Sequence, residues 1–143
     1  MKIAIAAILL VGLTLSTWIY VSRRRPAVAP VLPPVVSQAQ VSDFAEVAVT
    51  VTPLVVSPKQ NWEFQIALNT HISDQTTDLM ASAVLLVANK EYKPLAWDGD
   101  PPGGHHRSGR LIFAPPEPAA TAYALKLRLD GESEDRIFSW PKP

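Results

Sequence analysis

Apolar and polar residues alternate along much of the chain beyond residue 42, a pattern typical of half-buried strands. The clearest run is residues 62–69, where every second residue is large and apolar: Trp62, Phe64, Ile66 and Leu68. Residues 123–129 repeat the pattern, and an Asp130-Gly131 turn leads to a last strand at residues 137–140. This spacing predicts a C-terminal hairpin.

Four further strands are expected. Residues 47–56 alternate but contain Pro53, which predicts an edge strand with a bulge or kink. Residues 79–87 are apolar enough for a central strand, although their alanines would also suit a short helix. With short strands at 92–97 and 110–113, the count is about seven in roughly a hundred residues, which predicts an all-β fold, an immunoglobulin-like or cupredoxin-like β-sandwich.

The N-terminal segment has a different character. Residues 3–21 carry no charge, and as a helix they would span about 28 Å, close to the hydrocarbon thickness of a bilayer. Trp18 and Tyr20 suit the membrane interface, Arg23 to Arg25 suit the lipid headgroups, and no convincing signal-peptidase site follows. We therefore expect residues 1–25 to be an uncleaved N-terminal transmembrane helix with its basic flank.

A linker follows at residues 26–42, because four prolines between residues 26 and 40 disfavour a regular helix and favour an extended chain. The sandwich is expected to occupy residues 43–143. Orientation signals conflict: the three arginines favour the cytoplasm for the following chain, whereas Lys2 and the export-like start favour an extracytoplasmic domain. We expect the extracytoplasmic arrangement.

Charge and cysteine content restrict the partners. Setting aside Lys2 and Arg23 to Arg25 leaves nine basic residues against 13 acidic ones, so the body carries about minus 4. Without a concentrated basic face, no nucleic-acid partner is expected. The absence of cysteine excludes disulfides and thiolate metal ligands, including the site of a conventional cupredoxin.

Candidate chemistry is concentrated in the segment 97–109, which holds four of the six glycines of the chain and reads as a rigid loop. It includes Asp98, Asp100, His105 and His106, and the third histidine, His71, ends the clearest strand. If both segments lie at one end of the sandwich, these five side chains are candidate ligands for Cu(II) or Zn(II). One observation opposes this: adjacent residues in a strand point to opposite faces, so His105 and His106 share a metal only if the chain bends.

No signature of an enzyme is present: we find no nucleophile elbow, no paired zinc-protease histidines and no phosphate-binding loop. The leading hypothesis is a non-enzymatic, membrane-tethered binding module that takes copper or zinc. The alternative is a structural or assembly domain that contacts another envelope protein through a sheet face or edge, with the histidine segment serving only the fold.

The segments NWEFQIALNTHISD and KPLAWDGDPPGGHHRSGRL, within residues 46–140, resemble a recurring prokaryotic membrane-anchored or exported domain. The run GGHHR carries most of this resemblance. It implies a reusable sandwich module and assigns no activity.

Overall fold

The computed structural model describes residues 38–117 and 122–141. The chain divides into two compact units, Met1–Pro33 and Pro34–Pro143, and every described residue belongs to the second. The expected membrane anchor and most of the linker lie outside the described residues. Across the part that is described, no helix is long and apolar enough to cross a membrane.

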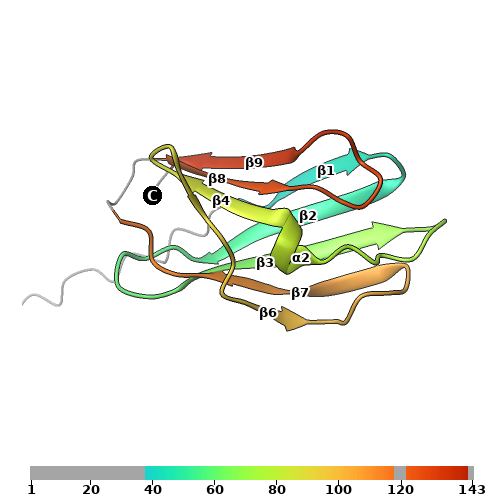
Figure 1. The fold of residues 1–143 in the computed structure, drawn as a ribbon, viewed down its shortest axis with the longest axis horizontal. Helices are drawn as coiled ribbons and strands as arrows, with labels where there is room; N and C mark the ends of the chain where they lie inside the picture. The colour runs from blue at the N-terminus through green and yellow to red at the C-terminus, as the bar shows by residue number, and fades with distance from the viewer. Residues whose placement is uncertain (1–37, 118–121, 142–143) are drawn as a thin grey trace, which may run out of the picture. The chain divides into compact units, whose positions relative to one another are not determined.

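The fold is all-β, as predicted, and is built from two antiparallel sheets (Figure 1). The first sheet has the order β1 (Gln40–Phe44), β2 (Val47–Val55), β3 (Trp62–Thr70), β7 (His106–Phe113) and β6 (Ala96–Gly99). The second has the order β5 (Lys90–Tyr92), β4 (Ala83–Val87), β8 (Ala122–Leu127) and β9 (Arg136–Pro141). One short helix, α2 (Leu79–Ser82), precedes β4.

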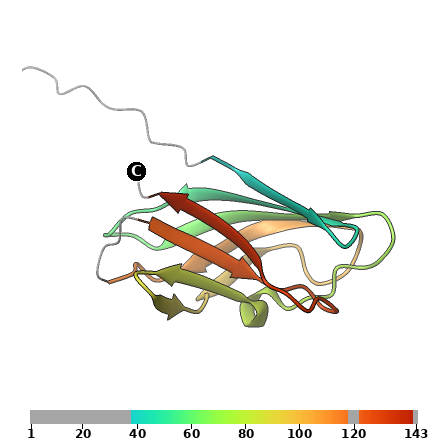
Figure 2. The same ribbon diagram turned by 90° about the horizontal axis from the view of Figure 1, so that it is seen from above.

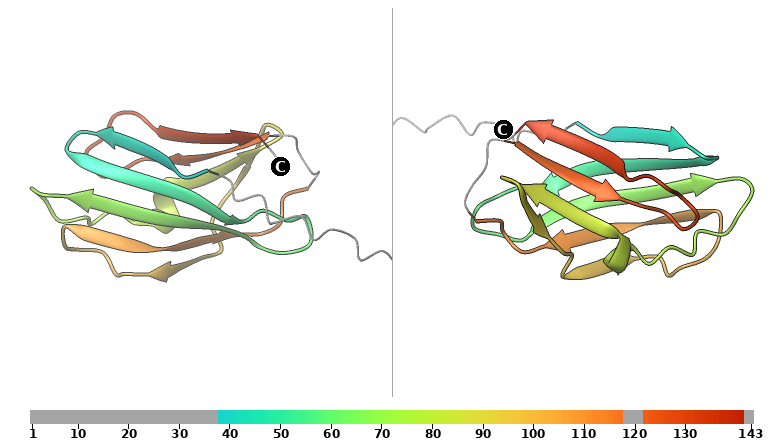
Figure 3. Two further views of the ribbon diagram at one scale, coloured as in Figure 1. Left: turned by 180° about the vertical axis from the view of Figure 1, so that it is seen from behind. Right: turned by 45° about the horizontal axis from the view of Figure 1, so that its top comes forward.

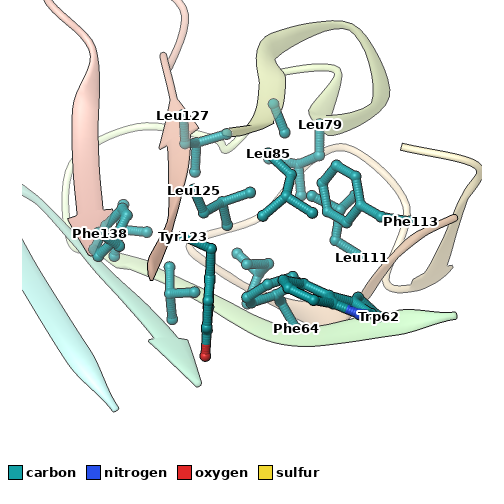
Figure 4. Close-up of a cluster of buried hydrophobic side chains, with 14 of the residues drawn as sticks. Trp62, Phe64, Leu79, Leu85, Leu111, Phe113, Tyr123, Leu125, Leu127 and Phe138 are labelled. Carbon is teal, nitrogen blue, oxygen red and sulfur yellow. The ribbon is translucent and has the colours of Figure 1, made fainter. Parts of the chain in front are cut away.

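The two sheets form two layers around one hydrophobic core (Figure 2). The predicted alternation is confirmed, since the apolar residues of β3 and β8 are buried and their neighbours are more exposed. Aromatic rings meet edge to face at the centre: Phe64 lies 5.8 Å from Phe113, and Trp62 lies 5.1 Å from Tyr123, between ring centroids (Figure 4). The contact of Trp62 on β3 with Tyr123 on β8 joins the two sheets.

A buried arginine closes the edge where β1 meets β9. The Arg136 guanidinium donates to the carbonyl oxygens of Ser42, Phe44 and Val47, and it forms an ion pair with Glu132. Both side chains of the pair are almost fully buried, at 3% and 6% exposure. One side chain thus holds the turn between β1 and β2 against β9.

The prediction of an edge strand at residues 47–56 is wrong, because β2 pairs with β1 on one side and β3 on the other. The predicted bulge is confirmed, since the register with β3 shifts between Pro53 and Val55. β1 pairs with β2 only as far as Val51, so Pro53 lies beyond the end of β1. A residue without an N–H is tolerated there because, among the described residues, no strand pairs with Pro53 on that side of β2. β1 itself begins at Gln40, inside the segment 26–42 assigned to the linker.

Two other strand assignments need correction. Residues 79–82 form α2 rather than the start of a strand, because the Asp78 carboxylate accepts from the N–H groups of Met80 and Ala81 and caps a helical turn. The single strand expected at 92–97 is two strands in different sheets, β5 and β6. The chain crosses between the sheets at residues 93–95, which include Pro94. With this division and the unexpected β1, the described residues contain nine strands rather than seven.

Candidate functional site

The segment 97–109 is only partly a loop. Trp97 to Gly99 belong to β6 and His106 to Gly109 belong to β7, which leaves residues 100–105 as the connection. The prediction of a continuous rigid loop is therefore wrong at both ends. Glycine does not mark only the loop here, because two of the four glycines, Gly99 and Gly109, lie opposite each other within the strand pair.

Gly99 and Gly109 leave room for the Trp97 ring to lie over the paired strands β6 and β7. A Cβ atom on Gly109 would lie 2.5 Å from the Gly99 Cα and 2.6 Å from Cζ2 of Trp97. A Cβ on Gly99 would meet the Gly109 Cα at 2.4 Å. Neither position has room for a side chain, so the Trp97 indole covers the space that two side chains would otherwise take.

A buried arginine holds this tryptophan in place. The Arg107 guanidinium lies over the Trp97 ring at 5.3 Å and donates to the carbonyl oxygens of Asp100 and Thr77. Burial lowers the pKa of Arg107, against the opposing effect of the negative charges of Asp78 and Asp100. Trp97 Nε1 donates to the Asp100 carbonyl oxygen at 2.8 Å. Sequence analysis missed Arg107, because nothing in the sequence distinguishes a buried arginine from an exposed one.

The two candidate aspartates have structural partners. Asp100 accepts from the backbone N–H of Ser108 at 2.8 Å and from its hydroxyl at 3.3 Å, which closes the start of the loop onto β7. Asp98 forms an ion pair with Arg110, which also pairs with Glu63 at 3.2 Å. Both carboxylates therefore neutralise or orient protein groups.

The loops carrying the histidines lie at one end of the first sheet, which meets the condition set for the candidate site (Figure 3). They interlock through backbone hydrogen bonds: Gln75 exchanges bonds with Gly103 and Gly104, and the Thr70 N–H donates to the His105 carbonyl oxygen at 2.9 Å. Gly103 and Gly104 have φ values of 124° and 73°, a region that favours glycine. The loop backbone is thus fixed while all three histidines stay exposed.

The histidines separate into a pair and a single residue. The rings of His71 and His106 lie 6.3 Å apart between centroids, nearly perpendicular, and His106 Nδ1 lies 2.9 Å from Asn69 Oδ1. His105 instead lies against Asp74, with 3.9 Å between Nε2 and Oδ1. This separation follows the alternation of side chains along an extended chain. The role of Asn69 was not predicted, because its contact with His106 depends on the register between β3 and β7.

The five predicted ligands are consequently not gathered around one point. Within residues 38–117 and 122–141, no three histidine, cysteine or acidic side chains are grouped so that they could hold a metal ion. What the arrangement offers is a pair of exposed imidazoles, one of them oriented by an amide. Such a pair can supply two nitrogen ligands and leaves other coordination positions to water or to another molecule.

A broad hollow of about 970 Å³ lies elsewhere, over the second sheet. Its lining includes Leu86, Ala122, Ala124 and Pro141, and Glu91 is the one charged side chain among the described residues that line it. None of the three histidines is among these lining residues.

No family model, curated protein or solved structure is similar enough to this chain to match it. The function must therefore be argued from the site itself.

Proposed function

We propose that this protein is a non-enzymatic, membrane-tethered module that binds one Cu(II) or Zn(II) ion through His71 and His106. The observation that carries the proposal is the imidazole pair, whose centroids lie 6.3 Å apart with one ring already hydrogen-bonded. Tethering by residues 3–21, an extracytoplasmic position and an immunoglobulin-like or cupredoxin-like architecture are parts of the same proposal.

Geometry supports two imidazoles on one ion. A nitrogen ligand lies about 2.0–2.1 Å from zinc, which puts each ring centroid about 3.2 Å from the metal. Two rings on one ion then have centroids about 4.5 Å apart at a right angle and about 6.4 Å apart on opposite sides. The observed 6.3 Å lies at the wide end of this range. The separation of the rings is thus compatible with one shared ion, provided that the exposed side chains turn a nitrogen of each ring toward it.

The donor set also ranks the metals. It contains imidazole nitrogen and no sulfur, and the remaining positions are open to water. Cu(II) accepts such nitrogen and oxygen ligands in a tetragonal arrangement, and at a given site it binds more tightly than Zn(II). With two protein ligands, we expect a dissociation constant on the order of micromolar for Cu(II), about −8 kcal/mol, and a weaker one for Zn(II).

The test is a titration of the full-length protein in detergent with Cu(II) and with Zn(II). Calorimetry measures the binding, and thermal unfolding measures the change in stability. One equivalent of Cu(II) should bind, and at a free concentration about 100 times the dissociation constant it should stabilise the fold by up to about 2.7 kcal/mol. The His71→Ala and His106→Ala variants should each lose most of this binding.

His105→Ala is the matched control, because His105 is equally exposed but pairs with Asp74. It should bind copper as the wild type does. Equal loss in all three variants would indicate nonspecific histidine binding and contradict the proposal. A folded protein that binds no metal would leave the histidine segment structural, in keeping with an assembly domain.

The position of the domain needs a separate test. A reporter that is active only outside the cytoplasm, fused after Pro143, should be active, and a reporter that is active only in the cytoplasm should be silent. The opposite pattern would place the domain in the cytoplasm.

A further inference from the structure

We infer that Asn69 is the positioning residue of the proposed copper site, because it holds His106 in the tautomer whose Nε2 lone pair faces outward as the metal ligand. This inference rests on the proposed function, and it adds which nitrogen binds and which residue selects it.

Strand register places the two side chains together. Asn69 and His106 are directly opposed in the antiparallel pair of β3 and β7. Opposed residues project from the same face, with Cβ atoms about 4.5–5.5 Å apart. The backbone on either side is fixed as well, since the Thr70 N–H bonds the His105 carbonyl oxygen. The contact between the amide and the imidazole is therefore built into the sheet.

The chemistry of the contact determines the proton. Asn69 Oδ1 lies 2.9 Å from His106 Nδ1, and a carbonyl oxygen can only accept a hydrogen bond. Nδ1 must therefore carry the proton and donate it to Asn69. In a neutral imidazole the other nitrogen, Nε2, then holds the lone pair. Metal-binding histidines in proteins have the same arrangement, with the second nitrogen donating to an oxygen that fixes the ring.

His71 supplies the second ligand from the end of β3. It directly follows Thr70, the last residue of β3, and its ring lies near that of His106. Among the described residues, no hydrogen bond or ion pair involves the His71 ring. It can therefore rotate toward an ion held at Nε2 of His106, so one ligand is oriented in advance and the other adapts.

The experiment uses three forms of the full-length protein: wild type, Asn69→Ala and Asn69→Asp. Alanine removes the acceptor, whereas aspartate keeps an oxygen at the same place. Two quantities are measured: the tautomer of His106 in metal-free protein, from long-range proton–nitrogen NMR correlations, and the Cu(II) affinity. Asn69 is exposed, so all three should unfold at similar temperatures without metal.

We expect the wild type and Asn69→Asp to carry the His106 proton on Nδ1, and Asn69→Ala to lose this preference. Asn69→Ala should bind Cu(II) about 10 to 100 times more weakly than wild type, the usual effect of removing such a partner, and Asn69→Asp should bind at least as tightly. A purely structural role for Asn69 would not produce this rescue by aspartate.

Two results would overturn the inference while leaving the metal function intact: a wild-type His106 with its proton on Nε2, or copper binding that Asn69→Ala does not change. A wild type that binds no copper would instead overturn the proposed function, and with it the ligand role of His106. The NMR measurement does not depend on metal, so it separates the two failures.

Discussion

Replacing Gly109 with alanine tests whether β6 and β7 are held as closely as the structure indicates. The φ angle of Gly109 is not in the positive region, so alanine is allowed by its backbone. Without steric conflict, such a glycine-to-alanine change would stabilise the protein by about 0.4–1 kcal/mol, because it reduces the entropy of the unfolded chain. The sign of the effect is therefore informative.

The structure predicts the opposite sign. The new Cβ would lie 2.5 Å from the Gly99 Cα, 2.6 Å from the Trp97 ring and 2.8 Å from the Asp98 carbonyl oxygen. Two of these atoms are backbone and cannot move aside cheaply. Overpacking costs about 1–3 kcal/mol. Displacing Trp97 also loses its hydrogen bond to Asp100, about 1 kcal/mol. Set against the entropic gain, these costs leave an expected net destabilisation of about 2 kcal/mol.

The assay is urea-induced unfolding of the full-length protein, followed by tryptophan fluorescence and by far-ultraviolet circular dichroism. In thermal unfolding, this loss corresponds for a domain of about 100 residues to a fall in melting temperature of at least about 8 °C. Ser108→Ala is the neighbouring control, because Ser108 is exposed and its replacement adds no atom; it should change stability by less than about 1 kcal/mol. A Gly109→Ala protein as stable as wild type, or more stable, would refute the packing of Trp97 described above.

Two further predictions concern charged side chains. Arg136→Ala should lower the free energy of unfolding by about 3–5 kcal/mol, because it leaves the Glu132 carboxylate buried without a partner. Arg136→Lys should restore little of this stability, since a single ammonium cannot replace the several donors of the guanidinium. Equilibrium unfolding measures both variants. Burial of Asp135 acts to raise its pKa, but hydrogen bonds and charge from Arg128 and Lys126 outweigh this and lower the pKa below 3.8. A carboxyl group whose pKa is lowered in the folded state stabilises the protein above about pH 4, and this stabilisation is lost as the pH falls through the pKa of the folded state. Asp135→Asn should therefore reduce the loss of folding stability in acid. An unchanged dependence of stability on pH would contradict this prediction.

The strands that sequence predicted best are those whose burial decides their pattern. β3 and β8 lie in the interior with one face on the core, so hydrophobic alternation reports them directly. α2 and the division of residues 92–97 into β5 and β6 were not predicted, because they depend on one cap at Asp78 and on a crossing between sheets. The N-terminal strand β1 was not predicted either, since its residues are mostly exposed. It is held by its pairing with β2 and by side chains such as Gln40, whose Oε1 accepts from the Ser139 N–H.

The sequence predicted which segments carry the candidate site, but not how the side chains of those segments are arranged. The sequence named the two segments that carry His71 and His106 but left open whether they lie at one end of the sandwich, and the alternation of side chains indicated that His105 and His106 would point apart. The roles of Asn69 and Arg107 required the strand register and the burial of each side chain, which are properties of the folded chain. The aspartates illustrate the same limit, because a carboxylate in a candidate segment can equally serve a nearby N–H or guanidinium.

Strand β7 contains both the residues that pack against Trp97 and the proposed ligand His106, so the packing of this strand should affect metal binding. Arg107 follows His106 directly and fixes that point of the strand through Trp97 and two carbonyl oxygens. A ligand held on a rigid element keeps its geometry better than one on a mobile loop. The close packing at Gly109 therefore also determines how well His106 faces Asn69. On this reasoning, Gly109→Ala should weaken copper binding although Gly109 is not a ligand, whereas Ser108→Ala, on the same strand, should not.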